Sequence, residues 1–131
     1  MPVQVVAICG SLREHSHTRT ALGVALEGAA EKGAVTDLLD LREWDLPVYD
    51  ADADDAGDSV AFRERVRAAD SILLGTPMYH GSYSSPAKTA VDYCGFDEFE
   101  KKTVGLLGVA GGSFPITALE HLRSVCRALD A

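Results

Sequence analysis

The stretch VQVVAICGSLREHSHT, residues 3–18, decides the fold of this chain of 131 residues. Its first part, Val3–Cys9, is mostly apolar and β-branched and predicts a buried strand. The loop GSLREHSH follows, and from Thr18 to Lys32 apolar residues recur at helical spacing. Gly33 stands where a glycine commonly ends a helix. A strand, a short loop and a helix in this order predict the first unit of an α/β protein.

The same alternation continues along the chain. We expect further strands at 35–41, 71–75 and 103–109, and further helices at 59–69, 85–95 and 115–129. Ser59 and Ser85 suit helix N-caps, and Gly95 stands where the third helix would end. The segment 42–58 contains the run DADADDAGD and is expected to be an exposed loop. Strands that alternate with helices predict a doubly wound parallel sheet in a single domain, 1–131.

The charge of the chain is strongly negative. Twenty acidic residues against twelve Lys and Arg give a formal net charge of −8, which repels nucleic-acid phosphates and anionic membranes. No apolar run is long enough to cross a bilayer, and the N-terminus lacks a signal-peptide pattern. We therefore expect a cytoplasmic protein that binds neither nucleic acid nor membrane. Cys9, Cys94 and Cys126 show no CxxC spacing and are expected to be reduced, mostly buried thiols.

The loop after the first strand indicates a binding site, because ligands of such sheets bind beyond the carboxyl ends of the strands. Gly10 permits a sharp turn. Ser11, Ser16 and Thr18 bring hydroxyls to a helix N-terminus, where unpaired N–H groups and the helix dipole attract anions. Arg13 adds a charged donor. The pattern favours a phosphate site, and the plainer interpretation is an ordinary N-cap at Ser16 or Thr18 with Arg13 in solvent.

Other sites fit these residues less well. Neither GxxxxGK[ST] nor GxGxxG follows the first strand. A thiol phosphatase or arsenate reductase with Cys9 as nucleophile needs Cys-x₅-Arg, but His15 occupies that position and the arginine is Arg13. In the acidic run, Asp55 and Ala61 stand where a calcium-binding EF-hand needs Gly and Glu. We expect no metal site.

Two further loops end at the same edge of the predicted sheet. After the third strand comes TPMYHGSYSSP, residues 76–86, in which Met78 and two tyrosines offer soft or flat apolar surface to a ring such as isoalloxazine. A packed surface loop is the alternative. After the fourth strand comes AGGS, where Gly111 and Gly112 permit close approach of a ligand to the backbone.

The motifs GSLREHSHT, LREWDLPVYD and TPMYHGSYSSPAKTAVDY, with the later glycine pair, resemble the NADPH-dependent FMN reductase family of flavodoxin-like proteins. The resemblance covers essentially the whole chain. It implies an enzyme that passes hydride from NAD(P)H to bound FMN and electrons on to a flavin, quinone or azo-type acceptor, and it implies a homodimer or higher homo-oligomer. The cofactor-binding positions that it implies are Ser11, Arg13, Ser16 and Thr18 for the phosphate, with His17 beside them; Pro77, Met78, Tyr79, His80, Gly81 and Ser82 for the ring; and Gly111 and Gly112 for its pyrimidine side.

Three positions depart from the family pattern, which usually has Asn at Thr18, Glu at Met78 and Asn at His80. Thr18 keeps a hydroxyl for the phosphate, whereas the other two changes leave the electron acceptor open. Lys88 and Asp92 match a Lys…Asp pair in the third helix. Taken alone, they are an ordinary ion pair one helical turn apart.

A flavodoxin-like sheet has strand order 2-1-3-4-5, whereas this chain supplies 2-1-3-4 and no fifth strand. The strand at 103–109 is then an exposed edge unless a partner or further chain covers it. Because FMN carries the chemistry, no side chain is assigned as an obligatory acid or base. The alternatives are a flavodoxin-type electron carrier without NAD(P)H activity of its own and, less favoured, the Cys9-dependent enzyme.

Overall fold

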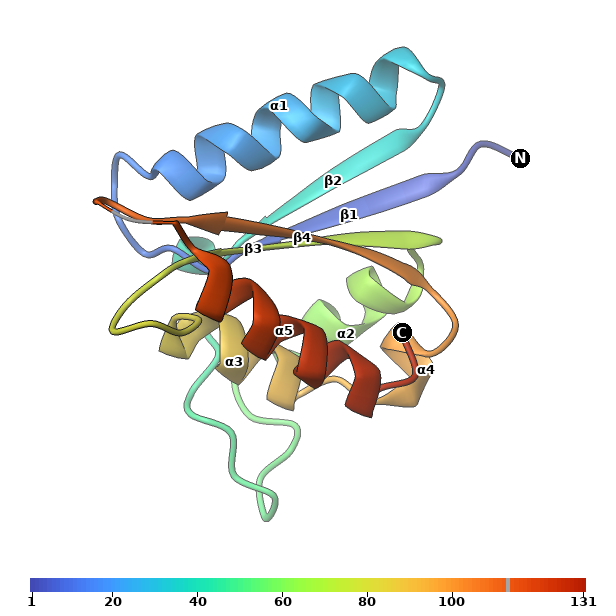
Figure 1. Ribbon diagram of the computed structural model, residues 1–131. Coiled ribbons are helices and arrows are strands. Elements are labelled where there is room, and N and C mark those ends of the chain that lie inside the picture. The colour runs from blue at the N-terminus through green and yellow to red at the C-terminus, as the bar shows by residue number, and fades with distance from the viewer. Residues whose placement is uncertain (113) are drawn as a thin grey trace.

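The computed structural model describes residues 1–112 and 114–131 and contains a parallel four-stranded sheet (Figure 1). Its strands are β1 (Gln4–Cys9), β2 (Val35–Asp40), β3 (Ser71–Pro77) and β4 (Thr103–Val109), in the order β2-β1-β3-β4. Cys9 at the end of β1 pairs with Asp40 on β2 and with Gly75 on β3. The strands therefore end close together at one edge, and the predicted fold class and strand order are confirmed.

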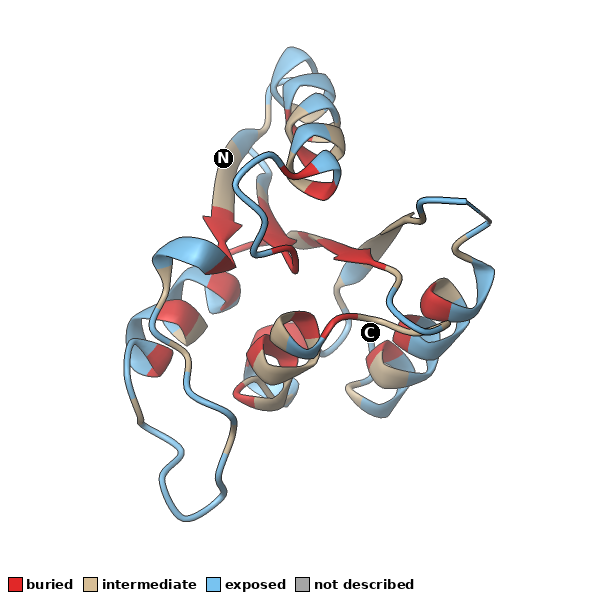
Figure 2. Ribbon diagram, turned by 90° about the vertical axis from the view of Figure 1, so that its left-hand side faces the viewer, coloured by how far each residue is buried: buried red, intermediate tan, exposed pale blue. Residues whose placement is uncertain are grey.

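Helices cover the two faces of the sheet unequally. Among the described helices only α1 (His17–Glu31) lies on one face, whereas α2 (Ser59–Arg67), α3 (Ser85–Asp92), α4 (Phe96–Phe99) and α5 (Ile116–Ala128) lie on the other (Figures 1 and 2). The predicted apolar stripe of α1 buries Leu22 and Leu26 against Ala7 and Cys9. Gly75 makes this packing possible, because a Cβ there would lie 2.7 Å from Leu22 Cδ1.

The larger core lies on the face that carries the other helices. Val6 and Ile8 point to it from β1, since side chains alternate between the two faces of a strand. Phe62 of α2, Phe99 of α4 and Leu122 of α5 meet them and are fully buried. Most of the hydrophobic stabilisation therefore lies on this side of the sheet.

Several predicted boundaries are wrong by a few residues. Ser84, not Ser85, is the N-cap of α3, because the Ser84 hydroxyl accepts the Ala87 N–H at 3.2 Å. At α2 the predicted cap, Ser59, is the first helical residue, and the N-cap position belongs to Asp58 without a side-chain cap. α3 ends at Asp92, and Gly95 begins the short helix α4 instead of ending α3.

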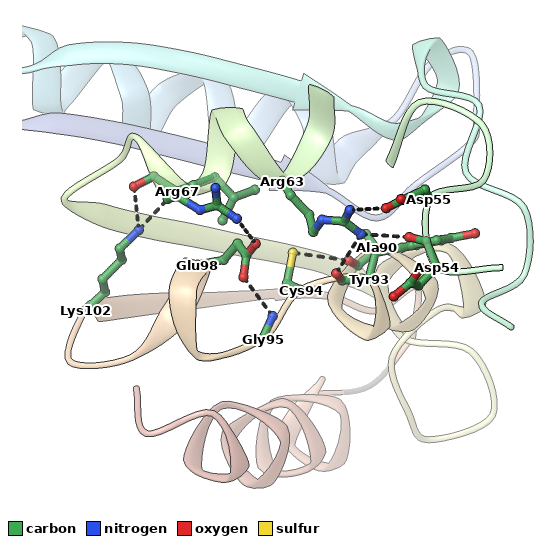
Figure 3. A network of polar contacts seen from close by, with 11 residues as sticks. Asp54, Asp55, Arg63, Arg67, Ala90, Tyr93, Cys94, Gly95, Glu98 and Lys102 are labelled. Atoms are coloured by element: carbon green, nitrogen blue, oxygen red, sulfur yellow. Dashed lines mark hydrogen bonds and ion pairs between the residues drawn. The ribbon is translucent and has the colours of Figure 1, made fainter. Parts of the chain in front are cut away.

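A polar network holds α2 against α3 and α4 (Figure 3). Glu98 is 3% exposed, and its two oxygens accept from Arg67 Nη2 at 3.1 Å and from Gly95 N–H at 2.9 Å. Lys102 Nζ donates to the carbonyls at the end of α2, and burial lowers the pKa of this amine. Arg63 donates to the Asp54 carbonyl and pairs with Asp55, which attaches the acidic loop to α2.

β4 is an edge of the sheet, as predicted. In the described part of the chain it pairs only with β3, and from its second residue onward it is half-buried. None of the described helices is both long and apolar enough to cross a membrane.

Candidate active site at the carboxyl edge of the sheet

The β1–α1 loop (residues 10–16) ends in a capped helix that retains free donors. Ser16 is buried, and its Oγ accepts the Arg19 N–H at 3.1 Å, so the interpretation of Ser16 as an N-cap is confirmed. Within the described chain, the backbone N–H groups of His17 and Thr18 find no acceptor. The start of α1 therefore offers unpaired donors and the positive end of the helix dipole to an anion.

Arg19 holds the carbonyl side of this loop, a role that the sequence analysis missed. Its guanidinium donates to the carbonyl oxygens of Arg13 and Glu14 and pairs with Asp40 Oδ2 at 3.3 Å. Asp40 reaches this position because β2 and β1 end in register. Arg19 thus binds the backbone carbonyls of the loop. The Arg13 side chain is exposed and can contact a ligand.

A buried chain of hydroxyl groups joins the β1–α1 loop to β3 and α3. Gly10 N–H donates to Gly75 O at 2.9 Å, and Gly10 O accepts from Ser84 Oγ at 2.6 Å. Thr76 Oγ1 in turn accepts the Ser84 N–H at 2.8 Å. Gly10 is required here, because a Cβ would lie 2.7 Å from Ala87 Cβ. These contacts fix the position of the β1–α1 loop, the candidate phosphate site, relative to the loop that follows β3.

The β3–α3 loop (residues 78–84) contains a tight turn. Tyr79 and Ser82 exchange backbone hydrogen bonds of 3.0 and 3.2 Å. The two residues between them, His80 (φ 53°) and Gly81 (φ 79°), both have positive φ, as in a type I′ turn. The turn carries Tyr79 with 50% of its surface exposed.

Two side chains from the first turns of α5 contact the β3–α3 loop. Thr117 Oγ1 lies 3.6 Å from Met78 Sδ, and His121 Nδ1 lies 2.8 Å from Ser82 Oγ. Thr117 and His121 stand one helical turn apart and face the same way. Sequence periodicity gives α5 an apolar face but does not reveal this polar contact.

A cavity of about 510 Å³ opens between the three loops. Its volume is in the range of small-molecule and cofactor sites. Of the predicted residues it brings together Ser11, Arg13, His17, Thr18, Pro77, Met78, Tyr79 and Gly111.

The other predicted positions do not line the cavity: Ser16, His80, Gly81, Ser82 and Gly112. Val109 and Ala110 complete the lining and were missed, because two small apolar residues at a strand end carry no chemical signal. Ser113, the last residue of the predicted glycine loop, lies outside the described residues.

A second cavity, of about 520 Å³, lies at the opposite edge of the sheet between α2 and the first residues of β1 and β2. Gln4, Val35, Trp44 and Arg65 contribute to its lining. Ligands of parallel α/β sheets bind beyond the carboxyl ends of the strands. The first cavity is therefore the candidate active site.

Cys9 is poorly suited to act as a nucleophile. It is fully buried in the core beneath α1. Burial raises the pKa of its thiol and outweighs the hydrogen bond from the Ser11 backbone, which lowers it. A reactive cysteine needs an accessible, stabilised thiolate, so the geometry disfavours a Cys9-dependent hydrolase.

The model of the NADPH-dependent FMN reductase family matches residues 3–131. The chain belongs to this family. Among its curated relatives, an FMN-dependent NADPH-azoreductase of Staphylococcus saprophyticus is 37% identical over 131 residues. One of Staphylococcus haemolyticus is 39% identical over 129 residues. Each match covers 93% of this chain and 68% of the relative.

Solved structures support the fold of this FMN reductase family member. The apo form of the NADH:FMN oxidoreductase EMOB aligns with a TM-score of 0.82 at 22% identity and covers 97% of this chain and 69% of that one. The flavoenzyme NAD(P)H:(acceptor) oxidoreductase FerB of Paracoccus denitrificans aligns at 0.80 with 24% identity, over 97% and 72%. Family membership confirms the prediction of an oxidoreductase that uses FMN and NAD(P)H, which the electron-carrier alternative does not match.

Proposed function

We propose that the carboxyl-edge cavity binds FMN with its phosphate on the β1–α1 loop and its ring against the loops after β3 and β4. The enzyme then oxidises NAD(P)H and reduces a flavin, quinone or azo-type acceptor. One observation carries the proposal: anion-binding donors and an exposed aromatic side chain face the same cavity.

The phosphate end of the cavity suits a dianion. The free N–H groups of His17 and Thr18 and the Arg13 guanidinium can all donate to phosphate oxygens. Ser11 and Thr18 add hydroxyl groups and are each only 2% exposed. Local donors at contact distance outweigh the net charge of −8, because the distant carboxylates are screened by water and salt.

The other end of the cavity suits a flat heteroaromatic ring. Pro77 and Met78 form an apolar wall, and Tyr79 offers an aromatic face beside it. At Gly111 and Gly112 a Cβ would meet no atom within 4 Å, so a ligand can approach the backbone there. The N–H groups of Gly111 and Gly112 are then available to the polar edge of the ring.

When bound, FMN accepts hydride from NAD(P)H and passes electrons to the second substrate. The chain contributes binding and orientation. The phosphate donors fix one end of the cofactor, and the hydroxyl chain from Thr76 through Ser84 to Gly10 keeps the two sets of loops in register. No side chain of the cavity is needed as an obligatory acid or base.

The staphylococcal relatives are named FMN-dependent NADPH-azoreductases, which supports NADPH as the donor and an azo compound as one class of acceptor. Assembly as a homodimer, a cytoplasmic location and a single domain spanning 1–131 stay predictions. Size-exclusion chromatography with light scattering at several protein concentrations tests the first.

The test is NADPH oxidation by the purified chain with and without added FMN, using a one-ring quinone as acceptor. We expect turnover that requires FMN and saturates with it. A protein that binds FMN tightly but does not oxidise NADPH, while still accepting electrons from a separate reductase, would be a carrier and would contradict the proposal.

A further inference from the structure

A track of adjoining hollows leads away from the carboxyl-edge cavity. A hollow of about 370 Å³ lies next to that cavity, because Arg13 and Tyr79 line both. That hollow shares Leu12 and Pro86 with a third one of about 400 Å³, which reaches the segment 44–48. We name the second and third hollows together the side groove.

The walls of the side groove are mostly apolar although they face solvent. Leu12 is 54% exposed and Val48 is 84% exposed, and Leu46 and Pro47 line the same hollow as Val48. Pro86, at the start of α3, forms the opposite wall. Clustered exposed apolar side chains next to a cofactor cavity indicate a surface that binds an apolar group.

The outer wall is held by hydrogen bonds rather than left as a loose loop. Tyr93 Oη, at the C-cap of α3, donates to Pro47 O at 2.7 Å. The base of the loop closes where Asp45 N–H donates to Asp58 Oδ2 at 2.8 Å and Asp58 N–H donates to Asp45 O at 2.7 Å. Trp44 packs edge-on against Phe62, with ring centroids 5.5 Å apart. A groove formed in advance binds a ligand at a lower entropic cost.

The charge around the side groove is negative at its far end. Asp45 is the only ionisable side chain among the described residues that line the third hollow. The acidic run 50–58 follows directly along the chain, and of its carboxylates only Asp55 is paired with an arginine in the described structure. Asp45 lines the hollow itself, and a charge so close to a ligand is incompletely screened at physiological salt. An anionic ligand is therefore disfavoured there.

We propose that the side groove binds the distal ring of an elongated aromatic electron acceptor that is uncharged or cationic, and selects against sulfonated acceptors. The proposal rests on the proposed function, in which the near ring of the acceptor lies over the flavin. It names the substrate class that the cavity alone leaves open.

Trp44 gives a fluorescence signal for binding, because it is the only tryptophan of the chain and lines the groove. It also lines the cavity of about 520 Å³ at the opposite edge of the sheet, so a variant of Val48, which lines the groove alone of the two, assigns the signal. The FMN-loaded protein, without NADPH so that no turnover occurs, is titrated with uncharged azobenzene and with its sulfonated derivative while Trp44 fluorescence is recorded. We expect saturable quenching by azobenzene and at least about tenfold weaker binding of the sulfonate at low salt. Equal affinities would overturn the charge selection.

Val48→Asp and Val24→Asp form the matched pair of variants. Val24 is 65% exposed on α1, outside every hollow of the track. Val48→Asp should weaken azobenzene binding about tenfold, because it places a charge against an apolar ring. The KM of Val48→Asp for a two-ring azo substrate should also rise about tenfold relative to its KM for a one-ring quinone. Val24→Asp should change neither quantity, and equal behaviour of the two variants would overturn the proposal.

Two further measurements separate the possible failures. If the wild type shows no FMN-dependent NADPH oxidation with the one-ring quinone, the proposed function itself fails. If that activity is present but Trp44 quenching weakens as protein concentration rises, a second copy of the chain occupies the groove and the acceptor proposal is overturned.

Discussion

Replacing Gly10 with alanine should destabilise the protein and loosen its cofactor site together. An alanine Cβ at this position would lie 2.7 Å from Ala87 Cβ, 2.9 Å from Gly75 O and 3.1 Å from Ser84 Oγ. Two of these atoms belong to a strand and a helix that cannot move independently. Overpacking of this kind costs about 1–3 kcal/mol, and we expect the free energy of unfolding of Gly10→Ala to fall by that amount.

The assay is urea denaturation followed by far-UV circular dichroism, together with FMN titration of the folded variant. Relieving the clash must shift Gly10, which donates to Gly75 O and accepts from Ser84. The β1–α1 loop then moves relative to the β3–α3 loop, so FMN affinity should fall along with stability.

Gly28→Ala is the matched control. Gly28 lies inside α1, and a Cβ there would meet no atom within 4 Å. Alanine in a helix interior is favoured over glycine by about 0.5–1 kcal/mol, so this variant should be more stable and bind FMN normally. If Gly10→Ala unfolds at the wild-type urea concentration and keeps its FMN affinity, the close approach of the two loops is refuted.

Three further predictions concern the elements around the site. Ser84→Ala removes the α3 cap and the bond to the β1–α1 loop and should cost about 1–3 kcal/mol in urea titrations, whereas Ser85→Ala should cost little. Burial raises the pKa of Cys94 from its ordinary 9.0 to about 12, so the folded state keeps a proton that the unfolded chain releases. The free energy of unfolding should therefore fall as the pH rises from 9 toward 12. The fall should be smaller in Cys94→Ala, and urea midpoints measured below and above pH 9 will show the difference. Lys88→Ala breaks a half-exposed ion pair with Asp92 and should change the free energy of unfolding by at most about 0.5 kcal/mol, measured in the same way.

Local sequence signals account for most of the elements. β4 begins and ends where the run TVGLLGV predicts, and α1 lies between Ser16, which caps it, and Gly33, whose φ of 94° ends it. By contrast, α4 has only four residues, too few to show a helical period. The choice between Ser84 and Ser85 as a cap depends on a contact with Gly10, far away in the sequence.

The lining of the candidate cavity was predictable to the same extent and for the same reason. Ser11, Arg13 and Thr18 are recognisable because hydroxyl and guanidinium groups precede a helix. The role of Arg19 was not, since it depends on Asp40 arriving at the end of the neighbouring strand. Likewise, Tyr79 could be predicted as an aromatic wall, but the contacts of α5 with the neighbouring Met78 and Ser82 come from tertiary packing.

The central claim is tested most directly by titrating the apo-protein with FMN and following flavin fluorescence and visible absorbance. Wild type, Arg13→Ala and Arg123→Ala are compared. Arg123 is an exposed arginine on α5 and matches the change in charge. We expect saturable binding that weakens about tenfold or more in Arg13→Ala, because a hydrogen bond to a charged group contributes about 1.5–3 kcal/mol, and that is unchanged in Arg123→Ala. Binding that is absent from the folded wild type, or equally strong in Arg13→Ala, would contradict the account.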